Sequence, residues 1–342
     1  MAAGHCHWGR GRLARGAQGS AARPRAVPHS TAVRRPAAAR RLAALPNTSL
    51  FENNLANGVI HFFQDLWAYP FLRNAVIAAM LAAVAAGVTG SLVVVRRSTY
   101  LAGAVSHSVL AGLGLARLLE RRFGFDGLSP MGGAVLAAVA SALLLAWLTL
   151  RGKHRSDTVL SAVWTGGMAL GISFVAATPG YQDDLMSYLF GSLLLVSDGE
   201  LVWMAAADLA LLGVMALCYN RFLAIAFNAE LARLRGVRVA LYEVIYNVMT
   251  ALTVVLLVRV AGIVLAVALL TLPAATAGLI TRRLDRMMAA AAGIGAAVGV
   301  LGLAISYGPG WPPGATIVEL AIAVYLLVAA AKKLCAMRLR HP

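Results

Sequence analysis

Long apolar segments recur along the chain from about residue 70 onward, and short connections between them hold most of the polar residues. Stretches such as Asn74–Val95 and Gly127–Leu150 contain no fully charged side chain. The hydrocarbon core of a bilayer is about 30 Å thick, so a helix of roughly 20 residues crosses it. The pattern predicts nine spans, near residues 71–95, 98–119, 130–150, 158–177, 200–219, 240–259, 261–281, 287–307 and 314–331.

The composition agrees with a membrane protein. Of the 342 residues, 60% are hydrophobic and 13% are charged, which excludes an ordinary water-soluble domain. Membrane-spanning strands would form shorter segments of alternating polarity, so the spans are expected to be helices. Glycine and alanine are frequent, as in "MLAAVAAGVTGS", and small residues let helix backbones pack closely in lipid. We therefore predict an all-α polytopic bundle.

Basic residues gather at alternate ends of the predicted spans. Short cytoplasmic loops accumulate Lys and Arg, so these ends are expected to face the cytoplasm. Nine spans place the C-terminus inside, whereas Arg117, Arg121 and Arg122 depart from the pattern and leave a count of eight open. The basic ends are residues 96–97, 151–155, 221–238, 282–286 and 332–340.

The first 49 residues hold nine of the 30 Lys and Arg residues and no acidic residue, within a net charge of +16. Their composition, without the apolar core of a signal peptide, predicts a disordered basic extension over 1–49. An organelle transit peptide and a start codon assigned too early both stay open as its origin. The other basic residues lie at span ends, which argues against nucleic-acid binding. A transmembrane domain is expected over 50–335 and a cytoplasmic tail over 336–342.

Two shorter segments are also apolar enough to meet the membrane. Asn53–Tyr69 is predicted to lie at the interface, with Phe62, Phe63 and Trp67 at the headgroup level. Leu185–Val196 has 12 residues, too few to cross. It is predicted to form a re-entrant or surface-lying helix.

Few ionisable side chains fall within the predicted spans, and each is a functional candidate because burial in lipid is costly. His107 is the most informative, since a neutral imidazole is tolerated there and is a common ligand of divalent metals. The residues leave two interpretations of His107 open: a metal ligand, or a buried histidine hydrogen-bonded to Ser106, Ser108 or a backbone carbonyl. The full set is His107, Asp208, Glu243, Arg259 and Glu319.

Three further residues have the chemistry of a transport path. Asp183 and Asp184 are predicted in an outer loop, where carboxylates attract cations. Pro273 lies within a predicted span and removes one backbone hydrogen bond, which predicts a helix kink that frees a carbonyl oxygen.

The connection Asn220–Val237 differs from the other loops. Its apolar residues recur at helical spacing, which predicts a short cytoplasmic amphipathic helix. Such a helix lies either on the membrane surface or against a soluble partner subunit. The apolar positions are Phe222, Ile225, Phe227, Leu231 and Leu234.

The chain lacks the motifs of nucleotide hydrolysis and of common hydrolytic catalysis. It contains no G-x-x-x-x-G-K-[ST] phosphate loop, no H-E-x-x-H and no G-x-S-x-G. We therefore expect a transport subunit that is not an enzyme, with any energy from nucleotide supplied by another chain. An ion-coupled secondary transporter, with Asp208, Glu243 or Glu319 as proton carriers, is the alternative.

Five motifs follow one another over about residues 70–331: "GSLVVVRRSTYLAGAVSHSVLAGLGLA", "SYLFGSLLLVS", "FNAELARLRGV", "VAGIVLAVALLTLPAATAGL" and "ISYGPGWPPGATIV". In this order they resemble the membrane permease subunit of ABC importers for zinc, manganese and iron(II). The resemblance implies the type II importer permease fold. A permease of the cobalamin and iron-chelate branch, which has a related fold, is a further alternative.

The resemblance implies a permease homodimer or a pair with a closely related permease. It also implies ABC ATPase subunits and an extracytoplasmic metal-binding protein, assembled in the bilayer of a bacterial plasma membrane. No permanent cofactor is expected, and the cargo is a divalent metal, Zn²⁺ or Mn²⁺. His107 would contribute to a transient metal site on the path, and the loop 220–237 would couple to the ATPase. The implied coupling residues are Phe227, Asn228, Glu230, Leu231, Leu234, Arg235 and Gly236.

One position departs from the family pattern. Many members carry an aspartate four residues before the histidine, one helical turn away on the same face. The residue here is Gly103. Three explanations stay open: two His107 side chains meet across a dimer, Asp183, Glu243 or another group substitutes, or the site binds metal weakly.

Overall fold

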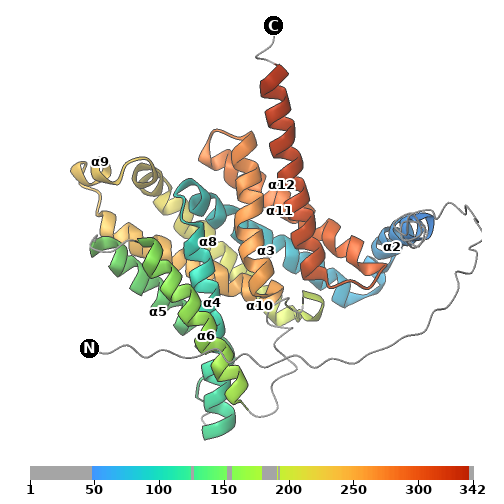
Figure 1. The fold of residues 1–342 in the computed structure, drawn as a ribbon, viewed down its shortest axis with the longest axis horizontal. Helices are drawn as coiled ribbons and strands as arrows, with labels where there is room; N and C mark the ends of the chain where they lie inside the picture. The colour runs from blue at the N-terminus through green and yellow to red at the C-terminus, as the bar shows by residue number, and fades with distance from the viewer. Residues whose placement is uncertain (1–47, 125–126, 152–155, 179–190, 192, 339–342) are drawn as a thin grey trace, which may run out of the picture. The chain divides into compact units, whose positions relative to one another are not determined.

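The computed structural model describes residues 48–124, 127–151, 156–178, 191 and 193–338, and in this part of the chain the regular structure is entirely helical. Figure 1 shows the helices along the chain. They are α2 (Thr48–Ala68), α3 (Pro70–Val95), α4 (Thr99–Phe123), α5 (Pro130–Arg151), α6 (Ser156–Ala177), the 3-10 helix η2 (Leu193–Leu195), α8 (Asp198–Phe227), α9 (Ala229–Leu234), α10 (Val239–Ile280), α11 (Leu284–Tyr307) and α12 (Pro313–Arg338).

Nine helical segments of the described chain are long and apolar enough to cross a membrane. This confirms the predicted all-α bundle and favours nine spans over eight. Seven helices supply one span each, and α10 supplies two, Val239–Arg259 and Ala261–Ile280. The ends agree with the predicted spans to within a few residues, except that α8 and α12 run past residues 219 and 331 to Phe227 and Arg338.

Helix α3 is the most deeply buried span and packs against both α10 and α11. Its small residues make this possible. Gly87 lies against the backbone of Ala292 in α11, and Gly90 lies against the carbonyl oxygen of Leu270 in α10. A Cβ atom at either glycine would overlap these neighbours. The small residues predicted to serve packing therefore bring α3 and its neighbours into backbone contact.

Two helices joined at Gly262 make up α10. The backbone of Gly262 has φ 77° and ψ 169°, a conformation that is essentially restricted to glycine. This break agrees with the predicted boundary between the spans 240–259 and 261–281, and Pro273 lies inside the second helix. The kink expected at Pro273 stays a prediction. Glycine permits the positive φ at this break. A proline is tolerated inside a membrane helix, because neighbouring groups satisfy the backbone carbonyl that it leaves free.

Helix α2 packs one side against the end of α11. The Phe62 ring is fully buried and meets the Tyr307 ring edge-on, with ring centroids 5.8 Å apart. The Tyr307 hydroxyl donates a hydrogen bond of 2.8 Å to the Asp65 carboxylate. Phe63 and Trp67, one turn apart, are exposed. The prediction for Phe62 at the headgroup level is therefore wrong, because its position on the helix turns it toward the core.

The single amphipathic helix predicted over Asn220–Val237 is in fact the end of α8 followed by the short α9. Asn228 ends α8 with an extended backbone, and its side-chain oxygen accepts a 3.0 Å hydrogen bond from the N–H of Leu231. This cap starts a new helix with a different direction. The apolar pattern is therefore divided, with Phe222 and Ile225 buried and the later positions exposed.

Several predicted features fall outside the described residues. The basic extension is outside up to residue 47, as are Asp183 and Asp184 and most of Leu185–Val196. Of that last segment, the structure describes Gly191, the 3-10 helix η2 and Val196. The expected tail begins as helix, because residues 336–338 continue α12.

We expect Gly90→Ala to destabilise the bundle, because the added methyl group would overlap the Leu270 carbonyl. Overpacking of this kind costs about 1–3 kcal/mol. The control is Gly293→Ala on α11, where an added Cβ meets no atom within 4 Å. Thermal unfolding in detergent measures both, and equal melting temperatures for the two variants would contradict the packing described for α3.

Candidate functional site

His107 lies on α4, which packs closely against α6. The imidazole ring lies beside the indole of Trp164, with ring centroids 4.9 Å apart and planes inclined by 35°. Gly167 of α6 is packed against the backbone of His107, and a Cβ there would approach the His107 carbonyl carbon to 3.0 Å. A glycine on the facing helix thus lets α6 approach the turn of α4 that carries the imidazole.

Gly103 lies one helical turn before His107 on α4 and packs against Trp164 of α6. A Cβ atom on Gly103 would overlap the six-membered ring of Trp164. The indole therefore occupies the space that a side chain at position 103 would need. A glycine at position 103, where many family members have aspartate, is therefore sterically matched to Trp164. The same indole ring lies beside the His107 imidazole.

The hydrogen bonds around His107 test one of the two interpretations of its role, the one in which a neighbouring group satisfies the imidazole. The hydroxyls of Ser106 and Ser108 donate to the carbonyl oxygens of Ala102 and Ala104, at 2.8 and 2.9 Å, within α4. Nδ1 of His107 is buried and has no hydrogen-bond partner. The interpretation in which Ser106 or Ser108 satisfies the imidazole is therefore wrong for Nδ1. A buried ring nitrogen without a partner retains the capacity to bind a ligand.

The other ionisable residues predicted within the spans have different environments. Glu243 is paired with Arg96, and Arg259 is paired with Glu200 at 2.6 Å. Glu319 is exposed, and Asp208 is buried with neither carboxylate oxygen hydrogen-bonded. The suggestion that Glu243 replaces the aspartate missing at position 103 is therefore not supported by this structure, because Arg96 already neutralises it. Among the described residues, no three His, Cys, Asp or Glu side chains gather as a metal cluster.

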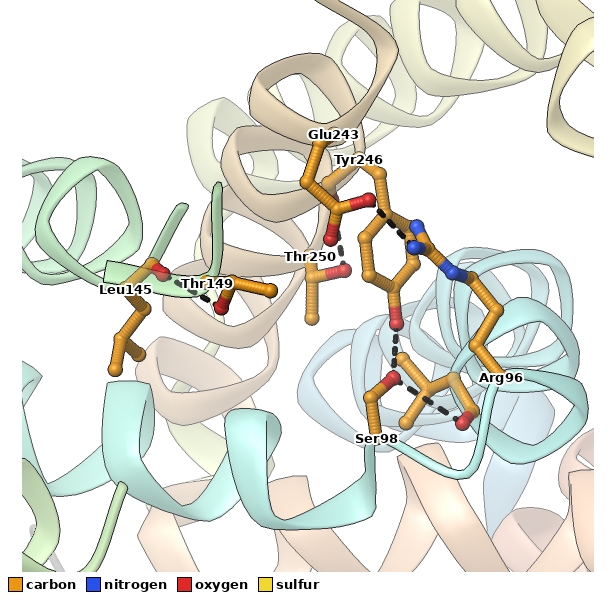
Figure 2. Close-up of polar contacts among 8 residues, drawn as sticks. Arg96, Ser98, Leu145, Thr149, Glu243, Tyr246 and Thr250 are labelled. Carbon is orange, nitrogen blue, oxygen red and sulfur yellow. Dashed lines mark hydrogen bonds and ion pairs between the residues drawn. The ribbon is translucent and has the colours of Figure 1, made fainter. Parts of the chain in front are cut away.

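A polar cluster joins the turn between α3 and α4 to the start of α10 (Figure 2). The Arg96 guanidinium forms an ion pair of 2.5 Å with Glu243 and lies 4.3 Å from the centroid of the Tyr246 ring. The Tyr246 hydroxyl shares a 2.5 Å hydrogen bond with the Ser98 hydroxyl. We call Arg96, Ser98, Glu243 and Tyr246 the turn cluster. It is located at the basic end of the spans.

Helix α9 and its flanks form an exposed surface at the same basic end. Ala232 is buried against Ile225 and Val239, which anchors α9 to the adjoining ends of α8 and α10. The residues implied for ATPase coupling all lie outside this contact. We call them the coupling surface, and each is exposed: Phe227, Asn228, Glu230, Leu231, Leu234, Arg235 and Gly236.

The sequence profile of the ABC-3 transport family matches residues 68–332. The chain belongs to this family. The match includes all nine spans up to the last turns of α12, as well as the coupling surface and the turn cluster.

Individual members of the ABC-3 family are similar over most of the chain. A membrane protein of Synechocystis sp. is 37% identical over 76% of this chain and 90% of its own length. The manganese import system permease protein ScaB of Streptococcus parasanguinis is 30% identical over 79% of this chain and 93% of its own. The solved structure of PsaBC from Streptococcus pneumoniae in complex with Fab has a chain that is 29% identical, with a TM-score of 0.70 over 79% of this chain and 95% of that one.

Sequence analysis did not identify Trp164 or the turn cluster. The sequence shows that Trp164 is in a Gly-rich span, but it does not show which helix faces His107. The turn cluster had a weak signal, because Arg96 and Glu243 have opposite charges and fall at predicted span ends on the same side of the membrane.

We expect the Gly103→Ala change to lower the melting temperature strongly, because its methyl group displaces the Trp164 ring. The Trp164→Ala change removes the obstacle, so the double variant should lose less stability than the sum of the two single variants. A double-mutant cycle by thermal unfolding measures the difference, which for residues in contact is about 0.5–3 kcal/mol. Strict additivity would contradict the contact.

Proposed function

We propose that this chain is the membrane permease subunit of an ATP-driven importer of divalent metal ions in the bacterial plasma membrane. The observation that carries the proposal is the buried, unpartnered Nδ1 of His107 in a membrane-spanning helix of an ABC-3 family protein. A similar family member, ScaB, is named as a manganese import permease. The cargo is zinc or manganese, with iron(II) as a further candidate.

The path must replace the water that a divalent ion loses on entering the bilayer, but it must also release the ion. An imidazole suits a transient contact, because it binds borderline divalent metals such as zinc as a neutral ligand. Trp164 occupies the neighbouring position, so His107 offers a nitrogen ligand without a carboxylate one turn away. High affinity then belongs to the extracytoplasmic metal-binding protein that delivers the cargo.

Energy for the cycle comes from separate ATPase subunits, since the chain contains no phosphate-binding loop. The ATPase docks on the coupling surface, where Leu231 and Leu234 provide exposed apolar contacts and Glu230 and Arg235 provide charged ones. Two permeases pair in the membrane, as identical copies or as closely related chains. Closure of the ATPase pair then changes the exposure of the His107 site from outside to inside.

The metal role of His107 is tested by the His107→Ala change in a complex reconstituted with its ATPase in liposomes. ATP-dependent uptake of radioactive zinc or manganese should fall to background, because the path loses its imidazole ligand. Co-purification with the ATPase should persist. Ser108→Ala is the matched control, since its hydroxyl bonds only within α4. Normal uptake by the His107 variant would overturn the metal role.

The docking role of the coupling surface is tested by Leu231→Pro and by Arg235→Glu. Proline removes the N–H that Asn228 accepts at the start of α9, and glutamate reverses a charge on the exposed face. Both variants should reduce metal-stimulated ATP hydrolysis and uptake together by about tenfold or more, a loss typical of removed interface hot spots. Arg283→Glu, in the connection between α10 and α11, is the control. Unchanged coupling in both test variants would remove the docking assignment.

A further inference from the structure

We propose that the turn cluster transmits the movement of α9 to α4 and thereby positions His107 during the transport cycle. This inference rests on the proposed function. Arg96, Ser98, Glu243 and Tyr246 would act as positioning residues, since they lie at the basic end of the helices rather than beside the imidazole.

The first step is the contact between α9 and the start of α10. Ala232 of α9 is buried against Val239 in the first turn of α10, and Tyr242 packs against the same group. A force on α9 therefore acts directly on the first turns of α10. Val239 and Tyr246 are seven residues apart in a continuous helix, a distance of about 10 Å at 1.5 Å per residue.

The second step is the connection from α10 to the turn between α3 and α4. Glu243 forms an ion pair with Arg96, and Tyr246 is hydrogen-bonded to Ser98 (Figure 2). Two residues of α10 that are three positions apart therefore contact the first and the last residue of the α3–α4 connection. The Tyr246 side chain is fully buried, and the Arg96 and Glu243 side chains are only 17% and 11% exposed. Because these side chains are largely shielded from solvent, we expect a displacement of α10 to displace Arg96 and Ser98 as well.

The turn itself is short and conformationally unusual. Only residues 96–98 separate α3 from α4, and Arg97 has a φ of 55°, which is uncommon for a residue other than glycine. The N–H groups of Arg97 and Ser98 bond to the carbonyl oxygens of Val94 and Val93. These are the two hydrogen bonds of a Schellman motif, which specifies this backbone at the end of α3, and the contacts from α10 fix the side chains on either side of Arg97. The start of α4 therefore follows α10.

The third step is α4, which runs without interruption from Thr99 to His107 and beyond. A continuous helix transmits a displacement along its axis, so a shift at Ser98 reaches His107 about 14 Å away. Trp164 and Gly167 of α6 lie against this part of α4. Movement of α4 relative to α6 would uncover the imidazole.

The chemistry of the turn cluster also suits a joint that moves. The Arg96 and Glu243 side chains keep a small exposed fraction, 17% and 11%, and each is a charged group that water solvates further when the two separate. The turn cluster is at the basic end of the spans, where Arg97 and the coupling surface are in reach of water. The turn cluster can therefore define how α4 and α10 are placed before and after the transport step and still allow the helices to move between the two arrangements.

The test uses the full permease–ATPase complex in liposomes and measures metal ions transported per ATP hydrolysed. Arg96→Gln and Glu243→Gln should each reduce this ratio roughly tenfold, within the range of typical coupling energies. ATPase binding and the rate of ATP hydrolysis should stay near normal. The exchanged pair, Arg96→Glu with Glu243→Arg, should recover a substantial part of the ratio, because it forms an ion pair again with the charges reversed.

Tyr246→Phe provides a milder variant if the charge variants do not fold, because it removes only the hydroxyl contact with Ser98 and keeps the buried ring. It should also lower the transport ratio. Arg283→Gln is the matched control, because both side chains of the Arg283–Asp285 ion pair are exposed. Folded variants of the turn cluster with a normal ratio would overturn the inference. If instead the unmodified complex moves no metal with ATP, the proposed function itself fails.

Discussion

Backbone contact between helices through small residues is the constraint on which the rest of the structure depends. Lipid gives little hydrophobic reason for one apolar helix to prefer another, so close packing and polar contacts have to supply it. In α3, Gly87 and Gly90 lie directly against α11 and α10. The depth of burial of α3 follows from these contacts. The contacts of the turn cluster form between α10 and the turn that follows α3, two elements held by this packing.

The same kind of packing shapes the candidate site. Gly167 lets α6 approach the backbone of His107, and Gly103 leaves room for the Trp164 ring. The donor set then follows from sterics, because a carboxylate at position 103 could not coexist with the indole in this arrangement. In the proposed function the ligand that remains on α4 is the half-buried imidazole of His107, with its Nδ1 atom buried. Zinc accepts nitrogen ligands more readily than manganese, which prefers oxygen, so the proposed ligand favours a borderline metal.

Most of the fold could be predicted from the sequence, because the length of an apolar segment is a local property that the bilayer converts directly into a span. The residues that sequence analysis misplaced depend on neighbours distant in the chain. Phe62 is buried because it packs against Tyr307, which lies far away in the sequence. Trp164 beside His107 is likewise a contact between two helices, and no spacing within either helix reveals it.

A metal carrier has to bind its cargo weakly and move reliably, and the two polar sites of this chain divide these requirements. In the proposed function His107 holds the ion, and among the described residues no group of three His, Cys, Asp or Glu side chains surrounds it, so the ion loses little when it leaves. Asp208 of α8 is buried without a hydrogen bond, but two other carboxylates are paired with arginines, Glu243 with Arg96 and Glu200 with Arg259, each pair joining different elements. Carboxylates used in this way define how helices meet rather than how tightly the cargo is held. Ion pairs between helices and weak binding of the metal within the membrane are therefore compatible in the proposed transport path.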